Sequence, residues 1–375
     1  MRILILSWRC IKNPAAGGSE LYFHELAKRW ARKGHEVVWF SPMFDGAKKE
    51  EIYEGIKIIR RGGRTTVYPL AFLEYISGRL GKFEVILDVE NGYPFFSRAY
   101  ARKTGIVLHI HHMHKEQWFK EFSFPIAQIG YFMESFLMPL IYKGVKLVTI
   151  CESSADEIML ENISRERAEV VNPGIDFYKK KKFEKSKEPS VLFLNRVKRY
   201  KGVDTLLEAA RILKKKNSRV KFWVAGGGED LPRVQAYAKE NGLDDVTFLG
   251  RVSEEKKREL MQKAWIFANP SFKEGWGIVN IEANYAGTLA VGCDIGGTRD
   301  SIIDGKTGLL FPLNDSKALA EVIGSLVKDG VLRKRLEKNA VKWAKNFDWD
   351  SKANQYLKIL IKESKAKQGI KYSNF

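Results

Sequence analysis

Short apolar runs alternate along the chain with segments in which apolar residues recur every three or four positions. Runs of four or five apolar residues bounded by polar or glycine-rich turns predict buried strands, whereas the longer spacing predicts amphipathic helices. In the first half, strands are predicted at Ile3–Ser7, Val37–Phe40, Ile56–Ile59, Val85–Asp88, Ile106–Ile110 and Leu147–Ile150. In the second half, they are predicted at Val191–Asn195, Lys221–Ala225, Val246–Leu249, Trp265–Asn269, Leu289–Gly292 and Gly308–Phe311.

Helical spacing lies between several of these strands, at Glu20–Lys33, Ser153–Glu161 and Asp204–Lys215. Alternating strands and helices indicate parallel sheets joined by crossover helices. A chain of 375 residues is too long for one ordinary core and suits two domains. We therefore expect an α/β protein with two Rossmann-like, doubly wound parallel sheets that face each other across a cleft, with ligands bound at the carboxyl ends of the strands.

The break between the two sheets is predicted in the segment from Asn172 to Ser190, which opens with a Pro-Gly turn and continues as a lysine-rich run. Such a run is typical of a solvated linker, and we expect a hinge there. The predicted domains are residues 1–172 and 173–348. The tail, from about 349 to 375, has helical spacing and is a candidate to pack back on the first domain.

The segment Phe122–Tyr142 is the most lipid-like part of the chain, but Gln128, Glu134 and two prolines interrupt it. A transmembrane helix needs about 20 almost uninterrupted apolar residues. We therefore expect a buried or interfacial helix here. The apolar run at the N-terminus is also too short for a signal sequence, and we interpret it as the first strand.

Charge and cysteine content narrow the class of protein. The formal net charge is +19, from 64 Lys and Arg against 45 Asp and Glu, which favours an anionic partner such as a nucleotide, a nucleic acid or an acidic membrane surface. Cys10, Cys151 and Cys293 are odd in number and far apart. They fit neither a disulfide framework nor a metal-binding motif, so we expect a reducing, cytoplasmic location.

Two loops that follow predicted strands carry glycines or basic residues suited to phosphate. Gly17-Gly18-Ser19 precedes a helix with Glu20 in its first turn, and a helix N-terminus with open amides favours an anion. Ordinary helix capping is the alternative interpretation. In the second loop, Arg196 and Lys201 flank the turn after a strand and are able to converge on a diphosphate, the alternative being general surface basicity.

A third loop, "KEGWGIVNIE", places Glu274 before Gly275-Trp276-Gly277 and Glu282 on the helix that follows. Exposed amides at a helix N-terminus suit hydroxyls or phosphate oxygens, and fixed carboxylates accept hydrogen bonds from paired sugar hydroxyls. The alternative is a capping carboxylate plus an exposed helical glutamate.

Four of the six histidines gather after one strand, namely His109, His111, His112 and His114. The sequence shows no cysteine or acidic cluster beside them, so no metal site is expected. A histidine at the end of this strand is suited to contact a sugar hydroxyl or to stabilise a leaving phosphate.

Together these residues resemble those of a known family. Glu274 and Glu282 stand at E-x₇-E spacing, Arg196 and Lys201 lie in "NRVKRYKG", Gly17-Gly18-Ser19-Glu20 follow the first strand, and "VVNPGID" closes the first domain. Over essentially its full length the chain resembles the retaining nucleotide-sugar glycosyltransferases of family 4, also called group 1. That resemblance implies the GT-B fold.

The resemblance assigns roles on the donor side. It implies that Arg196 and Lys201 hold the donor diphosphate, and that they, Glu274 and His111 are the catalytic residues. Glu274 accepts from the transferred sugar beside the amides of residues 275–278, which are Gly275, Trp276, Gly277 and Ile278. Glu282 binds the ribose, and the base lies near Arg251 and Val252.

On the other side, the resemblance implies that Gly17 and Gly18 close over the phosphates or the acceptor, with Glu20 and His112 on the acceptor side. His111 fits the family's histidine best, while His109 and His112 stay open as alternatives. The turn Gly226–Asp230 resembles the family's glycine-rich structural turn.

The implied reaction is a metal-independent, same-face transfer of a hexose from a UDP- or GDP-linked donor to a glycan or lipid-linked saccharide, without a cofactor. We also expect peripheral contact with anionic membrane at its cytoplasmic face and no nucleic-acid partner. One alternative is a nucleotide-sugar 2-epimerase on the same fold. A second, a basic nucleic-acid-binding protein, leaves the glutamate pair without a role. An NAD-dependent oxidoreductase is disfavoured, because G-x-G-x-x-G is missing.

Overall fold

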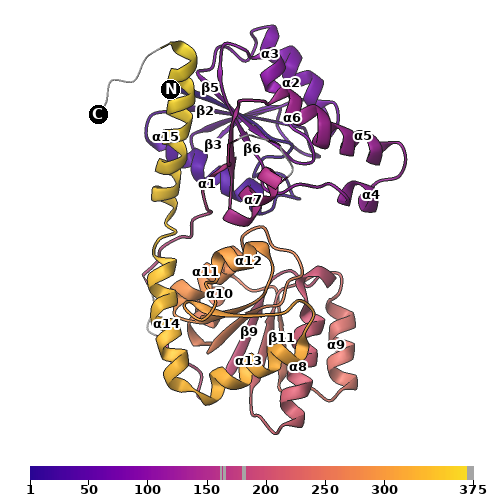
Figure 1. Ribbon diagram of the computed structural model, residues 1–375, viewed down its shortest axis with the longest axis vertical. Coiled ribbons are helices and arrows are strands. Elements are labelled where there is room, and N and C mark those ends of the chain that lie inside the picture. The colour runs from indigo at the N-terminus through magenta and orange to yellow at the C-terminus, as the bar shows by residue number, and fades with distance from the viewer. Residues whose placement is uncertain (161–162, 164–165, 180–182, 370–375) are drawn as a thin grey trace. The chain divides into compact units, whose positions relative to one another are not determined.

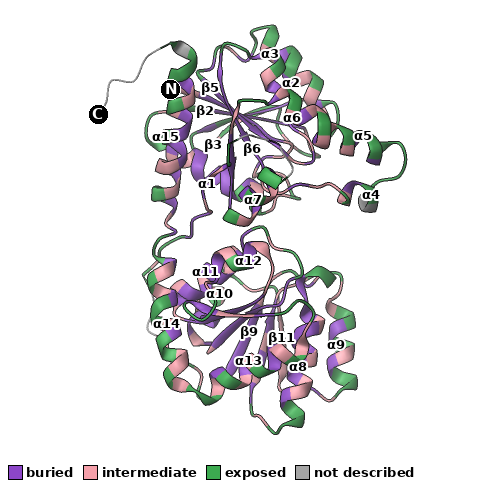
Figure 2. Cartoon of the chain, in the orientation of Figure 1, coloured by how far each residue is buried: buried purple, intermediate pink, exposed green. Residues whose placement is uncertain are grey.

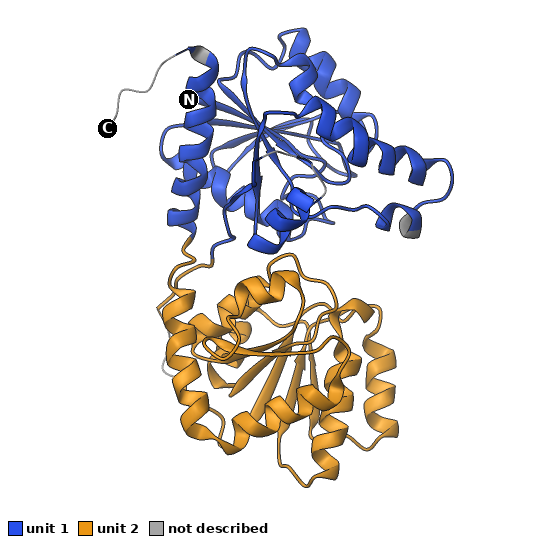
Figure 3. Ribbon diagram, viewed as in Figure 1, with its two compact units in different colours: residues 1–174, 349–375 blue, residues 175–348 orange. Residues whose placement is uncertain are grey.

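The chain forms two compact units, shown in different colours in Figure 3. The computed structural model describes residues 1–160, 163, 166–179 and 183–369. The first unit comprises residues 1–174 and 349–375, and the second comprises residues 175–348. The divisions are predicted after residues 172 and 348, and the structure divides after residues 174 and 348.

The first unit is built on a sheet with the strand order β3-β4-β2-β1-β5-β6-β7-β8. Its strands are β1 (Arg2–Leu6), β2 (Glu36–Ser41), β3 (Glu50–Tyr53), β4 (Ile56–Arg60), β5 (Val85–Val89), β6 (Gly105–His109), β7 (Lys146–Thr149) and β8 (Glu169–Val170). Neighbours pair in parallel except β3, which runs antiparallel to β4. The order reverses between β1 and β5, as in a doubly wound sheet.

Helices cover both faces of this sheet (Figure 1). They are α1 (Gly18–Arg32), α2 (Val67–Ile76), α3 (Ser97–Tyr100), α4 (Gln117–Glu121), α5 (Ile126–Phe132), α6 (Met138–Ile141), α7 (Glu152–Leu160) and α15 (Trp349–Gln368). The terminal helix α15 packs against α1, where the Trp30 indole donates to the Ala353 carbonyl at 2.9 Å. It also packs closely on β6, because a Cβ added at Gly105 would lie 2.6 Å from the Glu363 carbonyl oxygen.

The second unit has a fully parallel sheet with the order β11-β10-β9-β12-β13-β14. Its strands are β9 (Ser190–Leu194), β10 (Lys221–Ala225), β11 (Val246–Gly250), β12 (Ile266–Asn269), β13 (Leu289–Cys293) and β14 (Gly308–Phe311). This is the Rossmann order, with its switch point between β9 and β12. Each strand predicted in both halves is present, and the prediction of two Rossmann-like parallel-sheet domains is confirmed.

The second unit's helices cover two clusters of buried apolar residues, and Figure 2 shows the buried residues of this unit in purple. They are the 3₁₀ turn η2 (Arg199–Lys201) and α8 (Val203–Lys215), α9 (Leu231–Glu240), α10 (Glu254–Lys263), α11 (Ile278–Ala286), α12 (Gly296–Ser301), α13 (Ser316–Lys328) and α14 (Gly330–Ala344). In α8, Leu206, Leu207, Ala210 and Leu213 are all buried, as one apolar helix face predicts.

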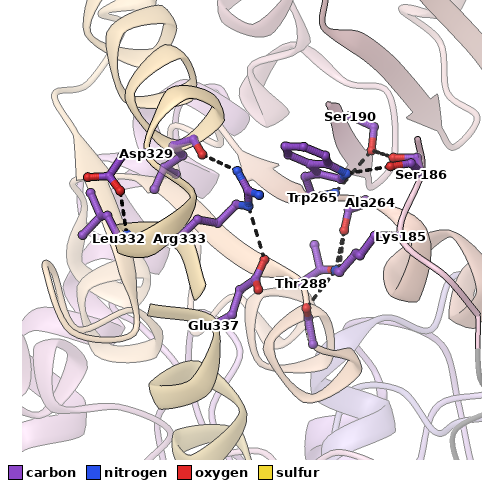
Figure 4. A network of polar contacts seen from close by, with 12 residues as sticks. Lys185, Ser186, Ser190, Ala264, Trp265, Thr288, Asp329, Leu332, Arg333 and Glu337 are labelled. Carbon is purple, nitrogen blue, oxygen red and sulfur yellow. Dashed lines mark hydrogen bonds and ion pairs between the residues drawn. The ribbon is translucent and has the colours of Figure 1, made fainter. Parts of the chain in front are cut away.

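Part of the lysine-rich segment predicted as a solvated linker is fastened to the second unit (Figure 4). Lys185 Nζ donates to the carbonyls of Ala264 and Gly287 at 2.5 and 2.8 Å. The Trp265 indole donates to the Ser186 carbonyl at 2.9 Å, and the Arg333 guanidinium covers the same indole at 4.0 Å from its centroid. The linker interpretation is therefore wrong for Lys185, which caps backbone carbonyls of the second unit. Residues 180–182 of the lysine run lie outside the described residues.

The predicted buried or interfacial helix at Phe122–Tyr142 folds as α5, a π-helical turn η1 (Met133–Leu137) and α6. Ala127, Gly130, Glu134 and Met138 form its buried side. Its opposite side exposes Ile126, Ile129, Phe132, Phe136 and Leu140, each more than half exposed. The helix is thus half-buried with an apolar outer face. Within the described residues, no helix is both long and apolar enough to cross a bilayer.

Candidate functional site

The strand order of the second unit brings two of the predicted loops together. Chain connections leave β9 and β12 in opposite directions, so the loops at their carboxyl ends flank the switch point, where open α/β sheets bind ligands. Residues 195–202 follow β9 and carry Arg196 and Lys201, while residues 270–277 follow β12 and carry Glu274. The topology therefore explains why motifs about 75 residues apart in sequence share one site.

Lys201 and Glu274 form an ion pair at this switch point, with Nζ and Oε1 2.6 Å apart. Their side chains are only 10% and 11% exposed. The two loops also touch through their backbones, since a Cβ added at Gly202 would lie 2.0 Å from the Pro270 carbonyl oxygen. Gly202 adopts φ +71°, which glycine tolerates best. Sequence reasoning assigned Lys201 and Glu274 to different parts of a ligand and did not predict that they pair.

Arg196 lies on the same loop and is exposed. Among the residues that the structure describes, its guanidinium makes no hydrogen bond or ion pair, so it is available to an incoming anion. The loop rests on the predicted structural turn: a Cβ at Gly226 would lie 1.8 Å from the Asn195 carbonyl oxygen, and one at Gly228 would lie 2.1 Å from that of Val197. These glycines allow the turn to support the loop from beneath.

The glycine-rich turn after Glu274 opens α11. Gly277 is its N-terminal cap with φ +71°, and Ile278 is the first helical residue. Trp276 is 5% exposed and packs on Phe347, with ring centroids 5.2 Å apart, so its backbone rather than its ring is presented at the turn.

The start of α12 packs directly against this turn. A Cβ added at Gly297 would lie 2.4 Å from the carbonyl oxygens of Glu274 and Gly275. This contact was not predicted from the sequence. The signal was present, because Gly296-Gly297 follows a strand and opens a helix, as Gly17-Gly18 does after β1.

Glu282 lies farther along α11 and faces a pocket lined by Asp176, Tyr178, Lys257, Arg258, Glu282 and Tyr285. Its Oε1 accepts from Lys257 Nζ at 2.8 Å, while its buried Oε2 has no partner among the described side chains. Burial raises the pKa of Glu282, and Lys257 opposes that effect. Glu282 therefore keeps one carboxylate oxygen without a donor among the described residues beside this pocket. Sequence reasoning did not identify Lys257, which comes from α10.

The residues proposed for the base, Arg251 and Val252, follow β11. Arg251 is exposed, and a Cβ added at Gly227 would lie 3.1 Å from its Cγ. Val252 is half-buried. Both lie at the carboxyl end of the sheet, but neither lines the pocket beside Glu282.

In the first unit, His111 belongs to a chain of polar contacts that starts on α1. The Ser19 hydroxyl lies 2.6 Å from His111 Nε2, and His111 Nδ1 lies 3.4 Å from His109 Nε2. His109 Nδ1 in turn lies 3.1 Å from the Tyr356 hydroxyl on α15. Burial lowers the pKa of His111 to about 4 and holds that of His109 well below its ordinary value. Both rings are therefore neutral near pH 7.

The remaining first-unit candidates lie at the start of α1 and after β6. Glu20 is buried, accepts from the Gly17 amide at 2.7 Å and pairs with Arg9 at 3.2 Å. These contacts match the helix-capping alternative, and a role for Glu20 toward an acceptor stays a prediction. Gly18 has open space at its Cα. The His112 ring stacks on that of His114, with centroids 4.8 Å apart.

One expectation from the sequence is wrong. No acidic cluster was expected beside the histidines, yet Glu90, His114 and Glu134 place their ligand atoms within 4.8 Å of one another. Glu90 follows β5 and His114 lies beyond β6, and neighbouring parallel strands end at the same edge of a sheet. The fold therefore gathers groups that the sequence separates.

Two family models match the chain. Residues 16–178 match "Glycosyltransferase Family 4", and residues 174–343 match "Glycosyl transferases group 1". Among curated relatives, a D-inositol 3-phosphate glycosyltransferase of Nocardioides sp. is 26% identical over 92% of this chain and 85% of its own length. A phosphatidyl-myo-inositol mannosyltransferase of Mycobacterium leprae is 32% identical over 45% of this chain and 46% of its own. Against the first two curated relatives, the match spans about half of their length.

Solved structures share the fold. Sucrose-phosphate synthase from Thermosynechococcus elongatus superposes with a TM-score of 0.76 and 20% identity, covering 97% of this chain and 99% of that one. Anabaena HepE in complex with UDP-glucose gives a TM-score of 0.73 and 18% identity, covering 96% and 100%. At these identities the likeness establishes the fold of the chain, which is the two-domain GT-B architecture.

Proposed function

Because the chain belongs to the group 1 glycosyltransferases of family 4 type, we propose that it moves a hexose from a nucleotide-diphosphate sugar to a glycan or lipid-linked saccharide, with retention of anomeric configuration. The observation that carries this proposal is the contact between Lys201 and Glu274 at the switch point of the second unit. A cation and a carboxylate held there match a ligand that joins a diphosphate to a sugar.

The second unit supplies the donor groups. The diphosphate is bound by Arg196 and Lys201, assisted by the amides of residues 275–278 at the start of α11. Arg196 is exposed and has no ion pair among the described residues. Glu274 accepts from hydroxyls of the transferred sugar. The free oxygen of Glu282 accepts from the ribose in the neighbouring pocket.

In the proposed reaction the acceptor oxygen attacks the anomeric carbon on the face from which the diphosphate leaves. The bond between that carbon and the phosphate oxygen breaks, and the same phosphate oxygen takes the acceptor proton. Arg196 and Lys201 stabilise the charge that develops on the diphosphate, so the transfer step needs no metal ion or cofactor. His111 is neutral near pH 7, which suits a hydrogen bond to a sugar hydroxyl better than stabilisation of a leaving phosphate.

The first test is a thermal-shift panel at fixed ionic strength with UDP, GDP, ADP, NAD and a short single-stranded RNA. UDP is the favoured nucleotide, because a structural neighbour was solved with UDP-glucose. One nucleoside diphosphate is expected to stabilise the chain by about 2.7 kcal/mol at 100 times its dissociation constant, equally with Mg²⁺ and with a chelator. Stabilisation by RNA alone would contradict the donor site and favour the nucleic-acid-binding alternative.

The epimerase alternative is separated by its product. An epimerase inverts carbon 2 of the sugar and leaves it on the nucleotide, whereas a transferase releases nucleoside diphosphate when an acceptor is present. Incubation with the donor alone, followed by chromatography of the intact nucleotide sugar, distinguishes the two. Accumulation of a 2-epimer without an acceptor would contradict the transferase proposal.

We further propose that the first unit touches an anionic membrane, at its cytoplasmic face, through the outer side of α5, η1 and α6. Ile126, Ile129, Phe132, Phe136 and Leu140 are exposed there, and the one acidic residue between 122 and 142, Glu134, is buried. An apolar face without exposed acid on a protein of net charge +19 is suited to an anionic interface. The names of relatives include a phosphatidylinositol mannosyltransferase, which is consistent with a lipid-linked acceptor.

Co-sedimentation with anionic liposomes at low salt tests this membrane contact. The double variant Phe132→Ser and Phe136→Ser is expected to lose most of the bound fraction. Val331→Ser, which removes an apolar side chain 83% exposed in the second unit, serves as the matched control and keeps wild-type binding. Equal binding by all three proteins would place the contact elsewhere.

A further inference from the structure

The first unit contains a buried cluster that the proposed transfer reaction does not use. It consists of Glu90 directly after β5, His114 in the loop after β6 and Glu134 in the π-helical turn η1. His114 Nδ1 lies 3.7 Å from Glu90 Oε1 and 3.7 Å from Glu134 Oε1. One imidazole and two carboxylates from three separate segments therefore converge on one point.

Glu90 is the group that its protein neighbours do not satisfy. The residue is 2% exposed, and neither of its buried carboxylate oxygens makes a hydrogen bond of ordinary geometry to any residue that the structure describes, although the Gly92 amide lies nearby. Burial raises its pKa to about 8, with His114 acting in the opposite direction. A buried carboxylate without donors is costly unless a cation or a proton compensates it.

Glu134 is held in the opposite way. Its Oε1 accepts from the His114 amide at 2.6 Å, and its Oε2 accepts from the Lys115 amide at 2.8 Å and from the Trp118 indole at 3.1 Å. Burial opposes ionisation, but the contacts with His114 and the two backbone amides outweigh it and keep the pKa of Glu134 below its ordinary value. These donors fix the orientation of the carboxylate and leave Oε1 with capacity for one more partner.

We propose that Glu90, His114 and Glu134 bind one divalent metal ion of the zinc class, which fastens η1 and the loop after β6 to the end of β5. Zinc bonds to nitrogen and oxygen ligands are about 2.0–2.2 Å long, which places ligand atoms of a tetrahedral site about 3.3 Å apart. The two 3.7 Å separations are within a few tenths of an ångström of that value. The ligand atoms of the Glu90 and Glu134 carboxylates lie within 4.8 Å of each other. Because two negative charges repel, a closer approach requires a cation between them.

The donor set selects among metals. Ca²⁺ takes six to eight oxygen ligands and Mg²⁺ keeps oxygen ligands and several waters, so neither fits a site with an imidazole and two carboxylates. Imidazole with carboxylates suits Zn²⁺, with Mn²⁺ and Fe²⁺ weaker. Water completes the fourth position. The site is structural: it holds the base of the apolar outer face formed by α5, η1 and α6, and it lies on the loop that carries His111.

The test is a Zn²⁺ titration of the full chain after chelator treatment, with bound metal counted by mass spectrometry and the melting temperature followed in parallel. We expect one Zn²⁺ per chain, a rise in melting temperature, and no comparable response to Mg²⁺ at the same concentration. Co²⁺ in place of Zn²⁺ should give the visible absorption of a low-symmetry, four-coordinate site.

Glu90→Gln keeps the shape of the side chain and removes its charge, so the variant should fold, with a metal-free melting temperature equal to or above that of wild type. Its Zn²⁺ affinity should fall at least tenfold, and His114→Gln should give the same loss. His24→Gln is the matched control, because His24 is a buried histidine of the same unit, 2.5 Å from Glu54.

Wild-type protein that binds no Zn²⁺, or Glu90→Gln that binds it as tightly as His24→Gln does, would overturn the proposal and leave Glu90 as a protonated acid. Because the readouts are metal content and stability, they do not depend on glycosyl transfer.

Discussion

Replacing Glu274 by Gln tests the ion pair between Lys201 and Glu274 at the proposed donor site. Lys201 Nζ and Glu274 Oε1 are 2.6 Å apart, and about nine-tenths of each side chain is buried. With an effective dielectric constant of about 20, the gross attraction is roughly 6 kcal/mol, most of which offsets desolvation. Removing one partner of such a pair costs about 3 kcal/mol of folding free energy, because the other charge is left buried and unpaired.

The same substitution separates nucleotide binding from sugar transfer. In Glu274→Gln, the Lys201 ammonium does not have to give up its ion pair with Glu274 before it binds phosphate. UDP or GDP should therefore bind this variant at least as tightly as wild type. The rate of sugar transfer should fall at least 100-fold, which corresponds to about 2.7 kcal/mol of transition-state stabilisation. The reason is that an amide oxygen accepts hydrogen bonds from the sugar hydroxyls more weakly than a carboxylate does. Lys201→Met should lose both nucleotide affinity and transfer.

Isothermal titration with the nucleoside diphosphate, together with a coupled assay of its release, measures both quantities. Lys28→Met is the control: Lys28 is a half-buried lysine of the first unit, 2.5 Å from Glu25, and its loss should leave nucleotide affinity unchanged. Near-wild-type turnover in Glu274→Gln would refute the sugar-binding role. Nucleotide binding lost as fully as in Lys201→Met would refute the competition between carboxylate and diphosphate.

Three further substitutions test one residue of the first unit and two residues of the second unit. Since burial lowers the pKa of His111 from 6.5 to about 4, the unfolded chain binds more protons between these values and stability falls as pH drops through that window. His111→Gln should reduce the change in unfolding free energy between pH 4.5 and pH 7 by up to about 3 kcal/mol, as measured by urea unfolding at the two pH values. Gly202→Ala should lower stability by more than about 1 kcal/mol, since its Cβ would meet the Pro270 carbonyl and φ is +71°; an unchanged melting temperature would contradict the loop contact. Glu282→Gln should raise the donor KM about tenfold with little change in kcat, as expected for a group that binds ribose equally in ground and transition states, and a selective loss of kcat would contradict that role.

The sheets were predictable because their signal is local. Apolar runs of four or five residues marked each major strand, glycine-rich turns marked the loops after β1 and β12, and basic residues marked the loop after β9. The antiparallel edge strand β3, Glu50–Tyr53, was missed because only Ile52 and Tyr53 interrupt its polar character and its side chains are largely outside the core. The two-residue β8 is too short to leave any periodicity.

The contacts that depend on chain topology were not predictable in the same way. Glu90 and Glu134 lie 24 and 20 residues from His114, and nothing in their local sequence joins them. Two weak signals were present: Glu90 stands directly after a buried strand, and Glu134 is the one acidic residue in a 21-residue apolar segment. A lone acid within an apolar amphipathic helix needs a buried partner, and here the partners are the backbone amides of the loop after β6.

The pairing of Lys201 with Glu274 changes what the sequence motif means. The motif assigns the lysine to phosphate and the glutamate to sugar, as two independent binding residues. In the structure they neutralise each other, so a buried lysine and a buried glutamate are held at the switch point without an uncompensated charge. Under the proposed function, donor binding replaces one partner of each: the diphosphate takes the lysine and the sugar hydroxyls take the glutamate. A nucleoside diphosphate alone satisfies only the lysine, and a free sugar satisfies only the glutamate. We therefore expect the intact nucleotide sugar to bind more tightly than the separate affinities of the nucleoside diphosphate and the free sugar predict. The internal ion pair would then be a source of selectivity for the whole donor.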